Sequence, residues 1–247
     1  MEEIYLWMLV SIALGGAGFL IAFTKALKER KRVLDSLPSE TTESILEGKE
    51  TLREALSRFT LVYTMLPGPA FTYTILVSIL VYTFGVQSDV QVRVIMGSLI
   101  AIGLSSFFAN LGRSFIYGEA MSGLNENEGG SRIDFGRYIV ILNIFETLAI
   151  FGLLISVLGL TLSGVTGADA SITMDAADMY FNGAVIFGLS TSCSILMGWL
   201  FNKLEGPLNE DMQLFAKKLQ YLFAAHMPAL IGLMIAVYLM IEGGMVG

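Results

Sequence analysis

The sequence has very little cysteine and histidine. Its one cysteine, Cys193, cannot form an intramolecular disulfide. With one histidine, His226, the chain shows neither a His and Cys cluster for a metal ion nor a Ser, His and Asp set for nucleophilic catalysis. A phosphate-binding glycine loop is also missing. We therefore expect no cofactor, and the chain itself offers no residues for nucleotide hydrolysis.

Charge is scarce as well. Charged residues make up 15% of the 247 residues, whereas hydrophobic residues make up 54%, and the mean hydropathy is +0.68. This composition does not describe a soluble domain and is typical of membrane proteins. The net charge of −7 implies no nucleic-acid partner.

Apolar runs of about 20 residues, the length that crosses a bilayer, recur along the chain. They predict helices over residues 4–25, 60–84, 92–117, 138–161, 179–202 and 220–241. Glu2 and Glu3 stand where a cleavable signal would have basic residues, so we expect the first helix to be retained. The predicted fold class is an all-α membrane protein with six transmembrane helices.

The cations gather on alternate loops. Every Lys and Arg except Arg93 lies in or beside residues 25–58, 113–137 or 203–218. By the positive-inside rule these segments face the cytoplasm, which predicts a multi-pass protein of the cell membrane with both termini outside.

One position recurs about every 80 residues, within the sequences LPGPAFTYTIL, IFETLAIFGLL and AHMPALIGLM. It holds Gly68, then Glu146, then His226. A repeat of this kind predicts three tandem helical hairpins. The predicted hairpins are residues 1–90 with a long cytoplasmic loop at 26–58, residues 91–170, and residues 171–247.

Glu146 is the one carboxylate at the repeated position. An ionised side chain inside a membrane costs about 2.5–3.5 kcal/mol, and such residues usually have a function. His226 gains charge when protonated, so we expect a satisfied, structural histidine. Gly68 cannot bind an ion, and the flanking Pro67 and Pro69 predict a bend in the second helix.

The first, third and fifth predicted helices are rich in glycine. Small residues let helices approach closely in lipid, so these helices are predicted to pack against their neighbours through them. The glycines are Gly15, Gly16, Gly18, Gly97, Gly103, Gly112, Gly183, Gly188 and Gly198.

The segment 144–154 resembles the second helix of the membrane-rotor proteolipid, subunit c or K, of V-type and archaeal-type rotary ATPases. In that family the ion-carrying glutamate is followed by Thr and often Gln before an apolar run. Leu66, Pro67 and Gly68 similarly resemble the carboxylate-free first hairpin of double-hairpin members. The resemblance covers all three hairpins, most sharply residues 98–160.

The resemblance implies a homo-oligomeric ring that turns against a stator subunit bearing a positive group. Glu146 would carry one transported H⁺ or Na⁺ per revolution. The chain would be a non-catalytic subunit of an ATP-driven ion translocase or ATP synthase. Cytoplasmic loops would contact a central-stalk subunit, although for the basic cluster in residues 28–32 we favour attraction to anionic lipids.

The ion ligands that the resemblance implies are Glu146 and Thr147, together with Asn143, Asn110 or backbone carbonyls. Since Leu148 stands where relatives often have Gln, proton transport is favoured over sodium.

Arg113 lies near the position of a ligand Gln in Na⁺-binding relatives. It could pair with Glu146, keep it ionised and displace the ion, or extend to the cytoplasmic interface; we favour the second.

Two other functions stay open. A repurposed proteolipid-like scaffold would form an oligomer without transporting an ion. A channel or secondary transporter would form small assemblies with a path lined by several polar residues.

Overall fold

The computed structural model describes residues 2–36, 52–85, 88–122, 131–166, 172–203 and 212–245, and within these ranges it is all helical. Six helical segments are long and apolar enough to cross a membrane. This confirms the predicted helix count and the all-α class. The helices are α1 (Glu2–Ser36), α3 (Leu52–Met65), α4 (Gly68–Phe84), α5 (Asp89–Ser122), α6 (Ser131–Leu162), α7 (Met174–Ser190), α8 (Cys193–Lys203) and α9 (Met212–Glu242).

Several helices extend beyond the apolar runs at the basic end. α1 continues to Ser36 and α5 to Ser122. The segment 26–58, predicted to be a loop, therefore begins and ends in helix, because the charged residues after the apolar run are still good helix formers. The apolar residues Leu52 and Phe59, in and beside this segment, lie in α3, whereas Ile45 and Leu46 lie outside the described residues.

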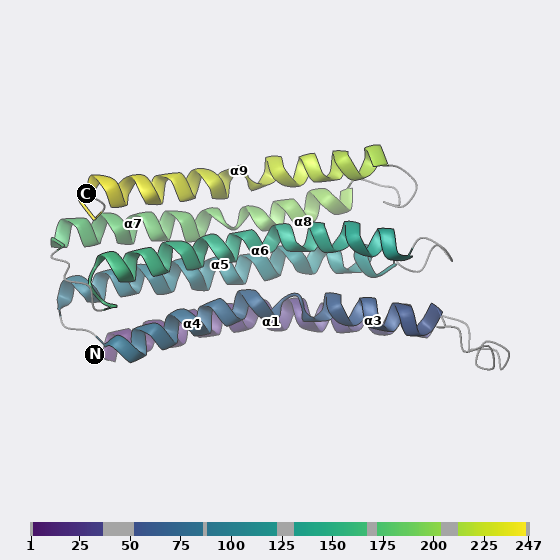
Figure 1. Cartoon of the computed structure of the whole chain (residues 1–247), viewed down its shortest axis with the longest axis horizontal. Coiled ribbons are helices and arrows are strands. Elements are labelled where there is room, and N and C mark those ends of the chain that lie inside the picture. Colours follow the sequence, from purple (N-terminus) through teal and green to yellow (C-terminus); the bar gives the residue numbers. More distant parts are fainter. Residues whose placement is uncertain are drawn as a thin grey trace.

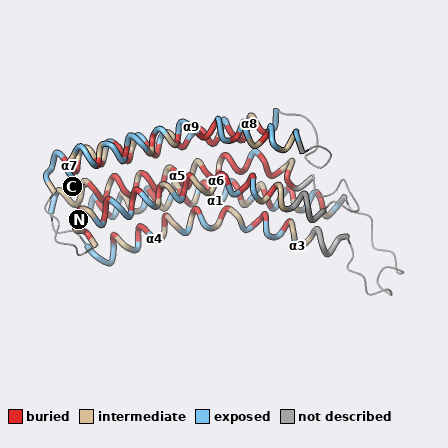
Figure 2. Tube along the Cα trace, turned by 45° about the horizontal axis from the view of Figure 1, so that its top comes forward, coloured by how far each residue is buried: buried red, intermediate tan, exposed pale blue. Residues whose placement is uncertain are grey.

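The helices lie side by side along the long axis of the molecule (Figure 1). α5 is central, since it contacts α1, α4, α6, α7 and α8, while α6 also contacts α4 and α9. Each helix is buried where it meets its neighbours and exposed outside, as Figure 2 shows. The exposed side chains include many large apolar residues, as expected for a surface that faces lipid.

Two of the six spans are interrupted. The second breaks at Leu66 and Pro67, as predicted, because proline lacks the amide hydrogen that would continue the helix. The fifth breaks between α7 and α8, which was not predicted. There the Ser190 and Thr191 hydroxyls donate to the carbonyls of Phe187 and Gly188, which competes with regular helical bonding.

The basic ends of the helices converge. Arg30 of α1 donates to Ser57 and Thr60 of α3, and the Arg137 guanidinium lies 5.8 Å from the Phe215 ring of α9. At the opposite end Arg93 pairs with Asp178, and the two chain termini also lie at one end (Figure 1). These positions are compatible with a multi-pass membrane protein, and which end faces the cytoplasm stays a prediction.

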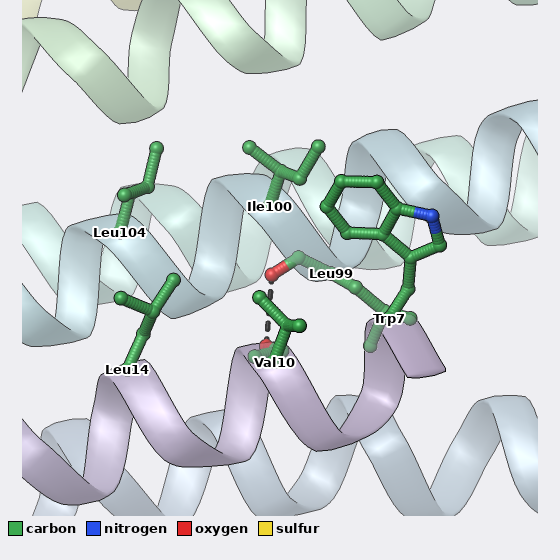
Figure 3. A pocket seen from close by; sticks show the side chains of 7 residues that line it. Trp7, Val10, Leu14, Leu99, Ile100 and Leu104 are labelled. Atoms are coloured by element: carbon green, nitrogen blue, oxygen red, sulfur yellow. Dashed lines mark hydrogen bonds between the residues drawn. The ribbon is translucent and has the colours of Figure 1, made fainter. Parts of the chain in front are cut away.

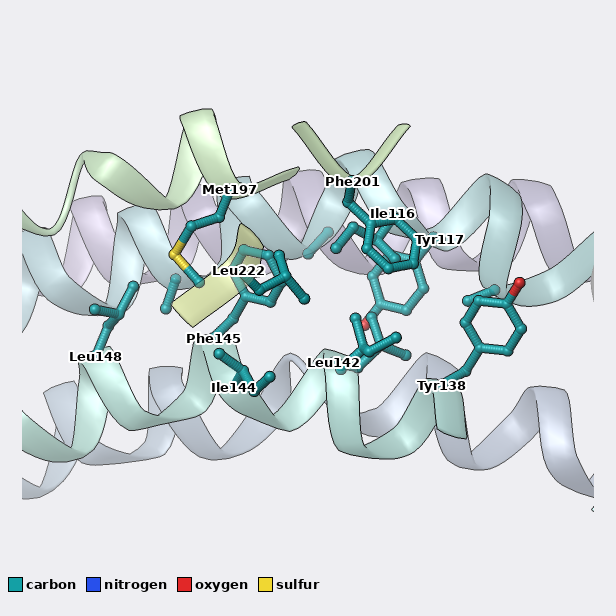
Figure 4. Packing of buried hydrophobic residues seen from close by; sticks show 14 of the residues in the cluster. Ile116, Tyr117, Tyr138, Leu142, Ile144, Phe145, Leu148, Met197, Phe201 and Leu222 are labelled. Atoms are coloured by element: carbon teal, nitrogen blue, oxygen red, sulfur yellow. The ribbon is translucent and has the colours of Figure 1, made fainter. Parts of the chain in front are cut away.

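One apolar cluster surrounds the middle of α6 (Figure 4). Leu142, Phe145 and Leu148 are fully buried there against α5, α8 and α9. Because Glu146 follows Phe145 directly, this packing fixes where along the axis of the helix bundle the carboxylate lies.

Candidate functional site

The break between α3 and α4 exposes backbone carbonyls inside the bundle. The helix stops at Met65 and begins again at Gly68, and none of the described backbone hydrogen bonds of this turn ends on the carbonyl oxygen of Leu66 or Pro67. Two side chains of α5 supply donors. Arg113 Nη1 donates to Leu66 O at 2.5 Å, and Asn110 Nδ2 donates to Pro67 O at 3.2 Å. In hydrocarbon an unsatisfied carbonyl is costly, so α5 stabilises the broken span.

The same arginine binds the intramembrane acid. Arg113 Nη2 lies 2.7 Å from Glu146 Oε2, and Arg113 Nε donates to the carbonyl of Leu142 at 3.1 Å. A further bond joins Nη1 to Asn110 Oδ1 at 3.1 Å. The Arg113 side chain is 0% exposed. One guanidinium therefore links the break beside α4, the middle of α5 and the acid on α6.

Arg113 thus does not extend to the interface, and the interpretation we favoured from the sequence is wrong. Buried oxygen acceptors from three parts of the chain are within its reach, so it is satisfied without water. A carboxylate next to it supplies the opposite charge.

The cation beside Glu146 is therefore a side chain of the protein itself. A carboxylate, two backbone carbonyls and one amide oxygen surround the guanidinium. Oxygen ligands of these kinds also bind metal cations. Arg113 therefore fills the place beside Glu146 that a transported ion would need. Among the described residues, no group of three His, Cys, Asp or Glu side chains could hold a metal ion.

The residues expected to bind an ion are only partly together. Asn110 joins Glu146 through Arg113, whereas Asn143 is exposed on α6 and no described contact brings it to this network. Thr147 donates to the Ile144 carbonyl at 2.6 Å and faces His226. Backbone carbonyls were expected as acceptors, and the structure identifies them as those of Leu66 and Leu142; the sequence could not name them, because backbone acceptors leave no mark in the residue types.

Glu146 keeps one oxygen free of the pair. Its Oε1 is buried and has no hydrogen-bond partner among the described residues. The side chain as a whole is 12% exposed, so the carboxylate lies just beneath the surface of the bundle. Tyr73 of α4 lies close enough to interact with its charge.

Among the described residues, one of the two ring nitrogens of His226 has a hydrogen-bond partner. Since the Thr147 hydroxyl gives its hydrogen to Ile144, it accepts from His226 Nε2 at 3.4 Å, which assigns the ring hydrogen to Nε2. The His226 Nδ1 atom is buried and has no partner in the part of the chain described. Our expectation of a satisfied histidine is therefore wrong for this nitrogen, because the apolar surroundings, including Phe151, offer it no donor.

Replacing His226 with Leu should change the free energy of unfolding by less than about 1 kcal/mol. The substitution removes one long hydrogen bond and one unpaired acceptor, and Thr147 keeps its bond to Ile144. Equilibrium unfolding in mixed micelles measures this difference. A loss of more than about 2 kcal/mol would show that His226 has a polar role that these contacts do not explain.

A second buried ion pair lies towards the basic end. Lys218 of α9, whose side chain is 0% exposed, pairs with Glu119 of α5, and its Nζ lies 4.5 Å from the Phe201 ring centroid. The sequence placed Lys218 in a loop. Because α9 begins at Met212, the lysine is instead held inside the bundle.

A scan against protein-family models and searches of the curated proteins and the solved structures found no match. The resemblance of residues 144–154 to rotary ATPase proteolipids therefore rests on the sequence motif alone.

Proposed function

We propose that this chain is a proteolipid-type membrane scaffold, which assembles with copies of itself and does not transport an ion on Glu146. The observation that supports this proposal is the position of Arg113. Its guanidinium is fully buried and bonded to Glu146, Asn110 and two backbone carbonyls. The acid that a rotor would need is already neutralised within the chain.

The energetics of loading favour a scaffold over a carrier. Protonating Glu146 would leave the Arg113 cation uncompensated inside the bundle, and losing one partner of a buried pair costs about 3–5 kcal/mol. A sodium ion at the same carboxylate would meet the guanidinium at short range and be repelled. The pairing of Arg113 with Glu146 therefore opposes the binding of either cargo.

The two spans of each predicted hairpin are in contact: α1 packs against α3 and α4, α5 against α6, and α7 and α8 against α9. The hairpins are joined to one another through α5, which also packs against α1, α7 and α8. Among the glycine-bearing helices, α5 contacts both α1 and α7. The outer helices α1 and α9 keep exposed apolar faces, which lipid or further copies can cover. A closed ring of such protomers is the proposed assembly.

An ion-carrying rotor is the second candidate, and one observation favours it. Glu146 Oε1 has no hydrogen-bond partner in the described part of the chain, and the carboxylate lies near the surface of the bundle. A positive group of a stator could compete there for the charge while Arg113 keeps its bonds to Leu66 and Leu142. The cargo would then be H⁺ rather than Na⁺, and the partners would be a stator and a central stalk.

A carboxylate-reactive carbodiimide separates the two candidates. The reagent modifies protonated carboxyl groups in apolar surroundings, so a Glu146 that is paired with Arg113 should stay unlabelled between pH 6 and 8. Peptide mass spectrometry of the purified full chain measures the modification. Wild-type labelling at Glu146 that Na⁺ or alkaline pH suppresses would refute the scaffold and support the carrier.

Arg113→Met is the positive control for the reagent. Without the guanidinium, burial disfavours the charged carboxylate, so Glu146 should become neutral and label. Imaging of the wild-type oligomer tests the assembly separately, and monomers under all conditions would contradict the ring.

A further inference from the structure

We infer that the seam between α1 and α5 binds one anionic phospholipid, with its phosphate headgroup at Lys25 and Lys28. A groove of about 600 Å³ opens at the basic end of this seam. It is lined by Ile21, Thr24, Lys25 and Lys28 of α1, Ser114 and Phe115 of α5, and Asn202 of α8. Three helices thus place two lysines, two hydroxyls and an amide around one hollow.

The charge of the groove fits an anion. Glu29 is buried, and its two oxygens each lie 3.0 Å from a cation, one from Lys25 and one from Arg32. Lys28 adds a third positive charge, so this stretch of α1 has an excess of positive over negative charge. The polar groups beside it are tied to the backbone. Asn202 donates to the Phe115 carbonyl and Ser114 to the Leu111 carbonyl, which fixes the wall of the groove.

The same seam has an apolar cavity farther from the basic end. It measures about 200 Å³ and is lined by Trp7, Val10, Ser11 and Leu14 of α1 with Leu99, Ile100 and Leu104 of α5. Figure 3 shows the side chains of Ile100, Leu104 and Leu14 around this hollow. Ser11 contributes little polarity, because its hydroxyl is bonded to the Leu99 carbonyl.

Helix geometry puts the two hollows on one side of the seam. Leu14, Ile21 and Lys28 follow one another at seven residues, or about two turns, so they share a face of α1. Leu104 and Phe115 are eleven residues apart on α5, which is about three turns. The path from Lys28 to Leu14 is about 21 Å at 1.5 Å per residue, somewhat longer than half of a hydrocarbon core of about 30 Å.

This layout matches a phospholipid in the leaflet at the basic end. The phosphate lies at the lysines, and one acyl chain follows the seam towards the apolar cavity. Basic pockets between transmembrane helices on the cytoplasmic side are known to bind acidic headgroups. A free phosphate would use the lysines but gain nothing from the apolar part, so we assign the site to a lipid. The assignment does not depend on whether Glu146 transports an ion.

Native mass spectrometry of the full chain, titrated in detergent with phosphatidylglycerol or phosphatidylcholine, tests this site. We expect one phosphatidylglycerol to bind preferentially. The Lys25→Gln/Lys28→Gln variant should lose about tenfold in affinity, since each lysine near a membrane surface contributes substantially to anionic-lipid binding. Lys25→Arg/Lys28→Arg should retain it.

The matched control is Lys31→Gln/Lys217→Gln, which removes the same charge from two exposed lysines outside the groove. It should change the affinity less than twofold. An equal loss in the control would show diffuse attraction to a basic surface and overturn the site. Equal binding of phosphatidylcholine by the wild type, a result that needs no variant to fold, would also overturn it. Displacement by millimolar inorganic phosphate would reassign the groove to a free anion.

Discussion

Arg113→Met and Glu146→Leu should each lower the free energy of unfolding by about 3–5 kcal/mol. Each substitution removes the partner of a buried charge, because Arg113 is fully buried and Glu146 nearly so. The remaining group then stays uncompensated or, for Glu146 in Arg113→Met, takes up a proton, and either outcome costs free energy. Arg113→Met also removes the donors that serve Leu66 and Leu142. The double variant has no stranded charge, so its loss should be smaller than the sum of the single losses by about 2–3 kcal/mol.

A second ion pair, also between an arginine and an acidic residue, provides the control for this double-mutant cycle. Arg93 and Asp178 lie 2.6 Å apart, but their side chains are 35% and 45% exposed. Exposed pairs contribute little, so the cycle of Arg93→Met with Asp178→Leu should give a coupling below about 1 kcal/mol. Both cycles are measured by equilibrium unfolding in mixed micelles. A coupling at Arg113 and Glu146 no larger than that of the control would contradict the buried pair.

The fold was predictable where one segment alone decides the outcome. A run of about 20 apolar residues has to cross a bilayer as a helix, so the six spans follow from composition. The break beside Pro67 is equally local, because proline lacks the amide hydrogen wherever it stands. The break after Ser190 was missed, since the hydroxyls there could equally have left the helix intact.

The partner of Arg113 was not predictable in the same way. An arginine close to the end of a span can extend to the interface or turn inward, and the choice depends on acceptors supplied by other helices. Here they are the Leu66 carbonyl, freed by a break 47 residues away, and a carboxylate 33 residues away. Lys218 presents the same difficulty, because its partner Glu119 is 99 residues away. Sequence spacing does not reveal such encounters.

The three residues at the repeated position, Gly68, Glu146 and His226, lie beside one connected set of polar contacts. Gly68 follows Pro67, whose carbonyl is bonded to Asn110, and Asn110 is bonded to the arginine that holds Glu146. On the other side His226 contacts Thr147, the residue after Glu146. The three repeat positions therefore border one polar level of the bundle. Of the three repeat positions, Glu146 alone is an acid, and it is paired with Arg113.

Gly112→Ala should lower the free energy of unfolding by about 1–3 kcal/mol, because α5 and α8 are in backbone contact at this glycine. A Cβ atom on Gly112 would lie 2.5 Å from the Ser194 carbonyl oxygen and 2.7 Å from the Phe145 ring. The first obstacle is backbone and cannot rotate away. Alanine also favours helix by up to about 1 kcal/mol, which offsets only part of the loss.

Gly136→Ala is the matched control, because a Cβ atom there would have no heavy atom within 4 Å and the helix preference gains the same amount. Its stability should be unchanged or slightly higher, and equal stability of the two variants would contradict the close approach of α5 and α8. Gly112 immediately precedes Arg113, and Phe145 immediately precedes Glu146, so a shift at this contact moves both partners of the buried pair. Gly112→Ala should therefore also make Glu146 reactive towards carbodiimide, whereas Gly136→Ala should not. This result would link the close packing at Gly112 to the pairing of Glu146 with Arg113.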